Sequence, residues 1–136
     1  MTFAELQVKI GQQVESEWHQ HKNGGGLVHK KATIGASAYV GENAVVFSGQ
    51  VFGDAWVSGD AWEKSPLFIV GSRHSLTNAK HGHIQIGCLC NTFKWWAGHY
   101  KAVGKQQGYT PAEIKEYGAY IALFSKVGQK EVKVKK

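Results

Sequence analysis

The chain has 136 residues, of which 43% are hydrophobic and 12% aromatic. This composition excludes a chain that is disordered throughout, and the length suits one compact domain. No apolar run approaches the roughly 18 residues of a membrane span, and the start of the chain lacks a secretion signal. Cys88 and Cys90 are too close in sequence to suit a disulfide with each other. A reducing, cytoplasmic location is therefore expected.

Lysine and arginine total 16 against 10 acidic residues, which gives a formal charge of +6. Arg73 is the only arginine. Because base-specific readout of nucleic acids relies on arginine, we do not expect sequence-specific nucleic-acid binding. Part of the excess charge lies in a basic tail, residues 130–136. The tail is predicted to be a solvated end, and the alternative is an electrostatic contact with an anionic partner.

Residues 1–31 are predicted to form N-terminal strands and a glycine-rich loop. Apolar residues alternate over residues 3–20, which predicts two strands around Gly11-Gln12; the alternative is a helix that starts at a Thr2/Glu5 capping box. Three glycines at 24–26 predict a flexible loop. Such a loop can cradle a phosphate, but the Lys-Ser/Thr pair and the following helix of a phosphate-binding loop are missing here.

Residues 32–63 contain a short repeat with steps of about six residues. Small residues precede each repeated aliphatic residue by two positions, and glycine or aspartate fills most of the gaps. The aliphatic residues are Ile34, Val40, Val46, Val51 and Val57, and their small partners are Ala32, Ala38, Ala44, Gly49 and Ala55. A small-x-aliphatic triplet predicts a short strand with both marked residues on one face. The intervening residues predict a corner after each strand.

This repeat resembles the left-handed parallel β-helix of hexapeptide-repeat proteins, in which three short strands make one coil. The one-residue deletion between Val46 and Val51 departs from the pattern and predicts a distorted corner. With one coil per 17 residues, Ile34 is expected beside Val51 and Val40 beside Val57. Fewer than two coils cannot bury a core alone, so this segment is expected to pack against the rest of the chain, against other subunits or against both. This favours a homo-oligomer, and the resemblance implies a trimer.

The same register predicts which residues face outward. Tyr39 is expected to meet Trp56, and Val45 is expected to meet Trp62, on the outer wall. Aromatic residues on a solvent-facing wall indicate a contact surface, either between subunits or with a host protein.

Residues 64–129 are predicted to form a β-hairpin and two helices. A buried strand is expected at 67–70, then strands at 75–79 and 83–88 around a turn at 80–82. Thr92 is expected to cap a helix over 92–107. Thr110-Pro111-Ala112-Glu113 is a strong signal for a second helix, which Gly128 ends. The expected fold is α+β, mainly β: a short left-handed β-helix, a small antiparallel sheet and two antiparallel helices.

The histidines suggest two arrangements, a metal site and a catalytic pair with a serine. His19/His21 and His81/His83 are His-x-His pairs, and Cys88 and Cys90 follow the second pair. The odd and even numbering places that pair and the cysteines on opposite faces of one strand, so we expect no metal and instead buried thiols. Ser72 with a nearby histidine could form a nucleophile and base, but a Gly-x-Ser-x-Gly elbow is absent, and we expect no catalytic residues.

The remaining polar and aromatic cluster is predicted to bind a ligand. Arginine and lysine suit an anion, and aromatic rings suit the stacking of a base. The N-terminus of the 92–107 helix would add its dipole. The candidate ligand-binding residues are Ser72, Arg73, His74, His81, His83, Asn91, Trp95, His99 and Lys101, and the candidate interface residues are Tyr39, Val45, Trp56 and Trp62.

Hexapeptide-repeat proteins are often trimeric acyltransferases, which implies a catalytic histidine leaving a coil. No histidine lies within 32–62, and His29 is a poor substitute, so a degenerate acyltransferase is a minor alternative. The wider pattern resembles short phage- and prophage-encoded proteins of unassigned activity. It comprises Asn-Gly-Gly-Gly at 23–26, the repeat, Ser-Pro-Leu at 65–67, Gly-Ser-Arg-His at 71–74, Ile-Gly-Cys at 86–88, Trp-Trp at 95–96, His-Tyr at 99–100 and Gly-Tyr-Thr at 108–110.

This second resemblance implies a phage-type accessory or counter-defence protein in the host cytoplasm. Its expected role is to sequester a small anionic ligand, of nucleotide type, without a cofactor and without catalysis. The alternative is a protein–protein inhibitor of a host factor that uses the outward aromatic residues. No membrane partner is expected.

Overall fold

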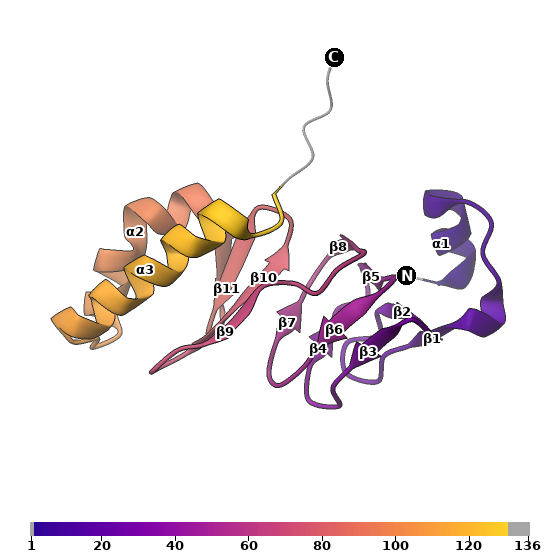
Figure 1. Cartoon of the computed structure of the whole chain (residues 1–136), viewed down its shortest axis with the longest axis horizontal. Coiled ribbons are helices and arrows are strands. Elements are labelled where there is room, and N and C mark those ends of the chain that lie inside the picture. Colours follow the sequence, from indigo (N-terminus) through magenta and orange to yellow (C-terminus); the bar gives the residue numbers. More distant parts are fainter. Residues whose placement is uncertain (1, 131–136) are drawn as a thin grey trace, which may run out of the picture. The chain divides into compact units, whose positions relative to one another are not determined.

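The computed structural model describes residues 2–130, which form three α-helices and twelve short strands (Figure 1). The α+β class predicted from the sequence is confirmed. The chain divides into two compact units, one ending at Pro66 and the other beginning at Leu67. The basic tail at 131–136 lies outside the described residues.

The first unit opens with helix α1 (Phe3–Ile10), so the strand predicted over the first part of 3–20 is wrong and the alternative helix is correct. Thr2 Oγ accepts a hydrogen bond from the Glu5 backbone N–H at 3.1 Å and caps the helix. Leu6 is fully buried but Val8 is 89% exposed, so the alternating apolar residues do not share one buried face as they would in a strand. A short 3₁₀ turn (Glu15–Glu17) then leads into strand β1 (Trp18–Gln20).

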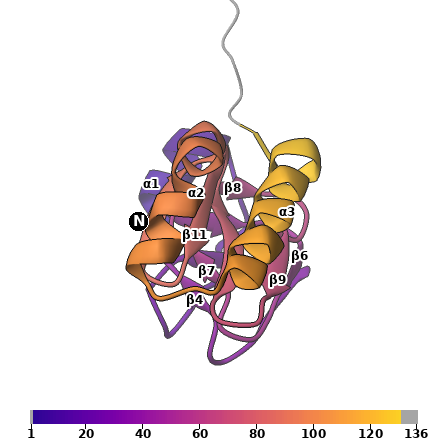
Figure 2. The ribbon, with the colours of Figure 1, turned by 90° about the vertical axis from the view of Figure 1, so that its left-hand side faces the viewer.

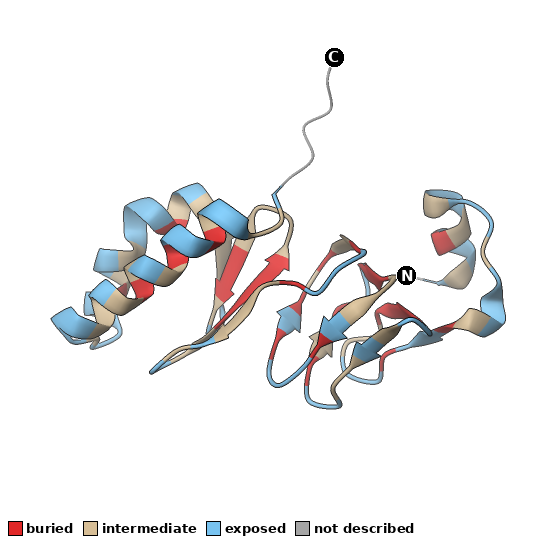
Figure 3. Ribbon diagram, viewed as in Figure 1, coloured by how far each residue is buried: buried red, intermediate tan, exposed pale blue. Residues whose placement is uncertain are grey.

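The strands of the repeat pair side by side in three parallel ladders. They are β2 (Leu27–His29) with β5 (Ala44–Val46) and β8 (Asp60–Trp62), β3 (Ala32–Ile34) with β6 (Gly49–Val51), and β4 (Tyr39–Val40) with β7 (Trp56–Val57). β1 pairs antiparallel with β2. Ile34 lies opposite Val51 and Val40 opposite Val57, which confirms the register predicted from the repeat. The repeated valines are buried (Figure 3).

The predicted outward pair of Val45 and Trp62 is wrong. Val45 lies opposite Ala61, and both Val45 and Trp62 are completely buried. The cause is the corner before β8, where Asp60 adopts a φ of 67°, the only positive φ at a described residue other than glycine. This corner shifts the pairing by one residue and turns Trp62 inward, where its indole N–H donates to the Gly59 carbonyl at 2.7 Å.

The glycine-rich loop packs tightly against β4 and is not a loose linker. A Cβ on Gly26 would lie 2.5 Å from the Gly41 carbonyl oxygen, and one on Gly24 would lie 2.2 Å from the Val40 oxygen. The Gly25 and Gly26 N–H groups donate to the His21 and Val40 carbonyls. Because these amides are used, the loop does not present them to a phosphate.

The second unit is a four-stranded antiparallel sheet covered by two helices. The strand order is β12 (Leu89–Thr92), β11 (His83–Ile86), β10 (Ser75–Lys80) and β9 (Phe68–Val70). β9 is an edge strand with Val70 72% exposed, so the fully buried strand predicted there is wrong. The predicted hairpin is confirmed by the antiparallel pairing of β10 with β11.

Both predicted helices are present, and they lie side by side on one side of the sheet (Figure 2). Thr92 caps α2 (Phe93–Gln106), and Thr110 with Glu113 forms the capping box of α3 (Pro111–Val127). The buried core between helices and sheet consists of Leu76, Ile84, Trp96, Tyr117, Ile121 and Phe124. Trp96 also donates its indole N–H to the Ile84 carbonyl at 2.8 Å, which ties α2 to β11.

Glycines allow α2 and α3 to approach each other closely. A Cβ on Gly118 of α3 would lie 2.6 Å from the Tyr100 ring of α2, and one on Gly104 of α2 would lie 2.8 Å from Ile114 Cγ1. A Cβ on Gly98, on the same helix as Gly104, would meet no atom within 4 Å. The helix contact therefore depends on Gly104 and Gly118, and not on Gly98.

We predict opposite effects for alanine at two helical glycines. Gly98→Ala should stabilise the protein by up to about 1 kcal/mol, because alanine favours the helix and the site is open. Gly118→Ala gains the same helix propensity but forces the Tyr100 ring aside, so it should destabilise the protein by about 1–3 kcal/mol. Urea unfolding followed by circular dichroism measures both. Equal stabilisation by the two substitutions would contradict this account of helix packing.

Candidate functional site

The structure divides the predicted ligand-binding residues between two ends of the antiparallel sheet. Arg73 and His74 precede the first residue of β10, whereas His81 and His83 lie at the hairpin that follows its last residue. The six residues of β10 separate the two ends by about 20 Å. Asn91 pairs with Ile84 on the hairpin side. The nine residues therefore do not form one site.

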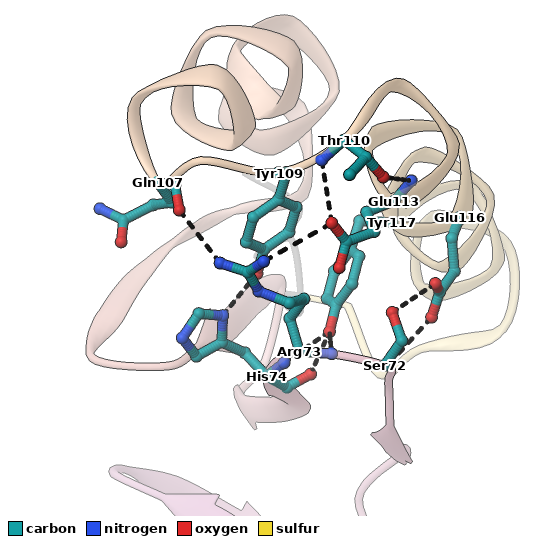
Figure 4. A network of polar contacts seen from close by, with 9 residues as sticks. All are labelled: Ser72, Arg73, His74, Gln107, Tyr109, Thr110, Glu113, Glu116 and Tyr117. Carbon is teal, nitrogen blue, oxygen red and sulfur yellow. Dashed lines mark hydrogen bonds and ion pairs between the residues drawn. The ribbon is translucent and has the colours of Figure 1, made fainter.

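The loop at 72–74 is tied to α3 by charged hydrogen bonds (Figure 4). Ser72 donates its backbone N–H and its hydroxyl to the two carboxylate oxygens of Glu116, at 3.0 and 2.5 Å. These bonds from the Ser72 hydroxyl, together with one from Tyr120, hold the pKa of Glu116 below its usual range. The Ser72 hydroxyl therefore donates its proton to a carboxylate, and not to the imidazole that a serine–histidine pair would require.

Arg73 extends from this loop toward the turn between the helices. Its guanidinium lies 3.6 Å from Glu113 Oε1, donates to the Gln107 carbonyl at 3.2 Å and sits 5.0 Å above the centre of the Tyr109 ring. The same Glu113 completes the capping box of α3. Arg73 is partly exposed and is thus a positioned cation that keeps one face toward solvent.

The Tyr117 hydroxyl holds the loop backbone in place. It donates to the His74 carbonyl at 2.7 Å and accepts from the Arg73 and His74 N–H groups at 2.9 and 2.6 Å. All three hydrogen-bonding positions of the hydroxyl are used. A Cβ on Gly71 would lie 2.5 Å from this oxygen, so the glycine gives the tyrosine room to reach the loop.

His74 and Tyr109 form a directed pair beside this anchor. His74 Nδ1 lies 2.5 Å from the Tyr109 hydroxyl. Burial, followed by the neighbouring Tyr117, raises the pKa of Tyr109 to about 12, so the phenol keeps its proton at neutral pH. The Tyr109 hydroxyl can donate to Nδ1 in the tautomer whose ring hydrogen is on Nε2. His74 is then a hydrogen-bond donor on the side away from Tyr109.

A pocket of ≈ 90 Å³ lies within the second unit at this end of the sheet. Aromatic and aliphatic side chains form most of its wall, and His74 and Gln107 add polar groups. The lining residues from the helices and their turn include Trp96, Tyr100, Val103, Tyr109, Tyr117 and Ile121. Two of these walls carry a cation, because Lys101 Nζ lies 6.0 Å from the Tyr100 ring centre and Arg73 stands over Tyr109.

The hairpin end of the sheet has a different character. His83 Nδ1 lies 2.9 Å from the His81 carbonyl, and Asn91 accepts a hydrogen bond from the Thr92 N–H at 2.9 Å. Trp95 and His99 stack on one side of α2 at 4.2 Å with nearly parallel rings. These residues are held by local contacts, and the pocket does not include them.

The cysteines and histidines do not gather into a metal site in the part of the chain that the structure describes. Cys88 is exposed, which corrects the expectation of two buried thiols, and burial raises the pKa of Cys90. In the first unit, His21 bonds the Ala38 carbonyl at 2.7 Å, and His29 bonds Glu17 at 2.7 Å. The bond from His29 lowers the pKa of Glu17.

Sequence reasoning missed the tyrosines that build the pocket. Tyr109 immediately precedes the capping residue Thr110. An apolar residue at this position often packs against the first turns of the helix as a hydrophobic staple, so the sequence does indicate that Tyr109 is packed against the protein. The spacing of apolar residues in the second helix indicates that Tyr117 is buried. Its hydroxyl contacts Arg73 and His74, which lie 44 and 43 positions earlier in the chain, so no local sequence pattern indicates these contacts.

Comparison with known proteins gave no match: no family model, curated protein or solved structure matches the chain. No helix within residues 2–130 combines the length and the apolar character that a membrane span requires. Function is therefore inferred below from the residues and their geometry.

We predict that Tyr117→Phe destabilises the second unit by about 2–3 kcal/mol, because two N–H groups and one carbonyl of the 73–74 backbone lose their partner. The control is Tyr120→Phe, which removes one hydroxyl bonded to Glu116, whose carboxylate keeps its bonds from Ser72, and it should cost under about 1 kcal/mol. Urea unfolding of both variants tests the difference. Equal losses would show that the Tyr117 hydroxyl does not anchor the loop.

Proposed function

We propose that the protein binds a small ligand that carries one planar ring and one anionic group, as nucleotides do. The observation that supports this most directly is the arrangement of cations over the pocket walls. Lys101 and Arg73 each lie over a tyrosine that lines the pocket, Tyr100 and Tyr109 respectively. Aromatic walls suit a flat ring, and cations at the rim suit the anionic group attached to it.

The size of the pocket limits what enters it. Drug-sized ligands occupy pockets of about 300–1,000 Å³, and this pocket measures ≈ 90 Å³. It therefore suits the ring of a ligand, while the rest of the ligand lies outside against the rim. The His74 Nε2 hydrogen can donate to an acceptor on the ring or on the anionic group.

Binding without catalysis is the role that this chemistry supports. Ser72 is hydrogen-bonded to Glu116, and Arg73 contacts Glu113 and the Gln107 carbonyl, so both side chains also hold the 72–74 loop in place. The resemblance to phage-encoded accessory proteins implies a use for such binding. In that proposal the protein removes a nucleotide-type signal from the host cytoplasm, and its basic charge speeds capture.

Thermal unfolding against nucleoside monophosphates, cyclic nucleotides and phenyl phosphate tests this function. We expect at least one anionic compound to raise the midpoint with concentration, and its neutral counterpart, the nucleoside or phenol, to act far more weakly. Lys101→Gln should weaken binding about tenfold, equivalent to about 1.4 kcal/mol, and Arg73→Ala should abolish the shift.

Lys115→Gln is the matched control, because Lys115 is exposed on α3 and does not line the pocket. It should bind like the unsubstituted protein. Equal binding of the ligand to the Lys101→Gln, Lys115→Gln and Arg73→Ala variants would show that cations at the pocket rim do not hold its anionic group.

The exposed aromatic pair of the first unit supports a second proposal, a contact between copies of this chain. Tyr39 and Trp56 lie opposite each other on β4 and β7 and stack at 3.9 Å, with Trp56 39% exposed. Phe52 of the same unit is 46% exposed. We infer that the three ladders form the left-handed coil of hexapeptide-repeat proteins. A stack of so few coils gains stability when a neighbouring copy covers such a wall.

Light scattering on the intact protein tests this contact. We expect a mass of about three chains, and Trp56→Ser should lower it because the exposed apolar area is lost. Val8→Ser replaces another exposed apolar residue of the same unit and should leave the mass unchanged. A monomeric unsubstituted protein would disprove the oligomer but would leave the ligand pocket untouched.

A further inference from the structure

Positive charge is concentrated in the second unit. Residues 67–130 contain seven lysines and one arginine against two glutamates, a formal charge of +6, whereas residues 1–66 carry five lysines against seven acidic residues. Both glutamates within residues 67–130 are engaged, Glu113 with Arg73 and Thr110, and Glu116 with Ser72 and Tyr120. The lysines of this unit therefore have little local negative charge to neutralise them.

Three of these lysines form a stripe on the solvent side of α2. Lys94, Lys101 and Lys105 are all exposed, and no carboxylate within residues 2–130 pairs with any of them. At 100° per residue the three side chains leave the helix within about 40° of one another, and they span about 16 Å along its axis. Figure 3 shows this outer face of α2 as largely exposed.

The composition of α2 is unusual for a helix that only needs to be soluble. It contains no acidic residue, so no i,i+4 ion pair supports it. Lys94 lies in the first turn, where a positive charge opposes the helix dipole. Positive charge that is present although it disfavours the helix suits a surface that binds a polyanion.

The residues around the stripe distinguish between polyanions. His99 is exposed and stacks on Trp95 with rings 4.2 Å apart and 6° from parallel, which leaves a flat aromatic surface on the exposed part of α2, about 120° around the helix from Lys105. The other exposed positions of this face are small or polar: Ala97, Gly98, Ala102 and Gln106. An anionic membrane would instead require large apolar side chains flanking the lysines. Stacked bases of a single strand fit both the aromatic surface and the lysines.

We propose that the outer face of α2 binds single-stranded nucleic acid without base specificity. Lys94, Lys101 and Lys105 contact successive parts of the phosphate backbone, and a base stacks on the exposed face of His99. The ligand pocket is lined by the opposite side of α2 through Trp96, Tyr100 and Val103, and of the three lysines only Lys101 also belongs to the proposed ligand site, through its place over Tyr100. The inference goes beyond the proposed function and stands without it.

Fluorescence anisotropy with a fluorescein-labelled fifteen-residue oligothymidine tests the inference on the whole protein. Three lysine contacts predict a slope of log affinity against log salt of about −2, since each contact to a single strand contributes about −0.7. The double variant Lys94→Gln/Lys105→Gln should reduce the slope by about 1.4 and weaken binding at least about tenfold in low salt. The α3 double variant Lys115→Gln/Lys126→Gln has the same net charge and should bind like the unsubstituted protein.

A second pair of variants tests the stacking surface. His99→Ala should weaken binding about fivefold or more, and His99→Tyr should restore it, because the tyrosine ring supplies the same flat face. If the substitutions acted only on helix stability, circular dichroism would show the same change in helix content for His99→Ala and His99→Tyr. Equal effects of the α2 and α3 lysine pairs would overturn the proposal, as would equal binding of a fifteen-base-pair duplex.

Two further experiments distinguish binding to single-stranded nucleic acid from binding to other anionic partners. Vesicles containing about one-third phosphatidylserine should bind much more weakly than the oligonucleotide, and the reverse order would overturn the proposal. Lys94→Gln/Lys105→Gln keeps Lys101 and Arg73, so it should retain the thermal shift with the pocket ligand. Loss of oligonucleotide binding in that variant with an intact ligand shift supports the inference independently of the pocket.

Discussion

The second unit depends on one hydroxyl group, that of Tyr117. It joins helix α3 to the backbone of the loop before β10 through three hydrogen bonds, at 2.6 to 2.9 Å. The bonds fix the direction in which Arg73 and His74 leave the loop, and so place a cation over Tyr109 and an imidazole beside it. The capping box at Thr110 sets where α3 begins and therefore which face carries position 117. A local helix-start signal thus determines a contact between distant parts of the chain.

Much of the fold could be predicted because it follows from local periodicity. The small-x-aliphatic triplets correctly gave the pairing of Ile34 with Val51 and of Val40 with Val57, and the capping residues gave both C-terminal helices. The prediction for Trp62 failed because it assumed a constant repeat. The corner at Asp60, with its φ of 67°, shifts the pairing by one residue, and in a strand a shift of one residue exchanges the inner and outer faces.

The candidate site was less accessible to sequence reasoning, for a related physical reason. Periodicity states which face a residue occupies but not which end of an element it approaches. His81 and His74 were grouped by chemistry, yet the length of β10 separates them. Arg73 was expected to be available for an anion, and the structure gives it Glu113 as a neighbour at 3.6 Å. Partners that lie about forty residues away in the chain leave no trace in a local pattern, so the hydroxyl contacts of Tyr109 and Tyr117 could not be found.

Helix α2 shows how packing on one side of a helix leaves the other side available for function. Its inner face is secured by the Trp96 indole bond to Ile84 and by the close approach of Gly104 to Ile114, and Thr92 caps its first turn. Because tertiary packing supplies most of the stability of a protein helix, the outer face needs no ion pairs of its own. A lysine in the first turn costs about 0.3–1 kcal/mol, which is small beside the burial of one large aromatic side chain. Unpaired positive charge can therefore persist on this surface without endangering the fold.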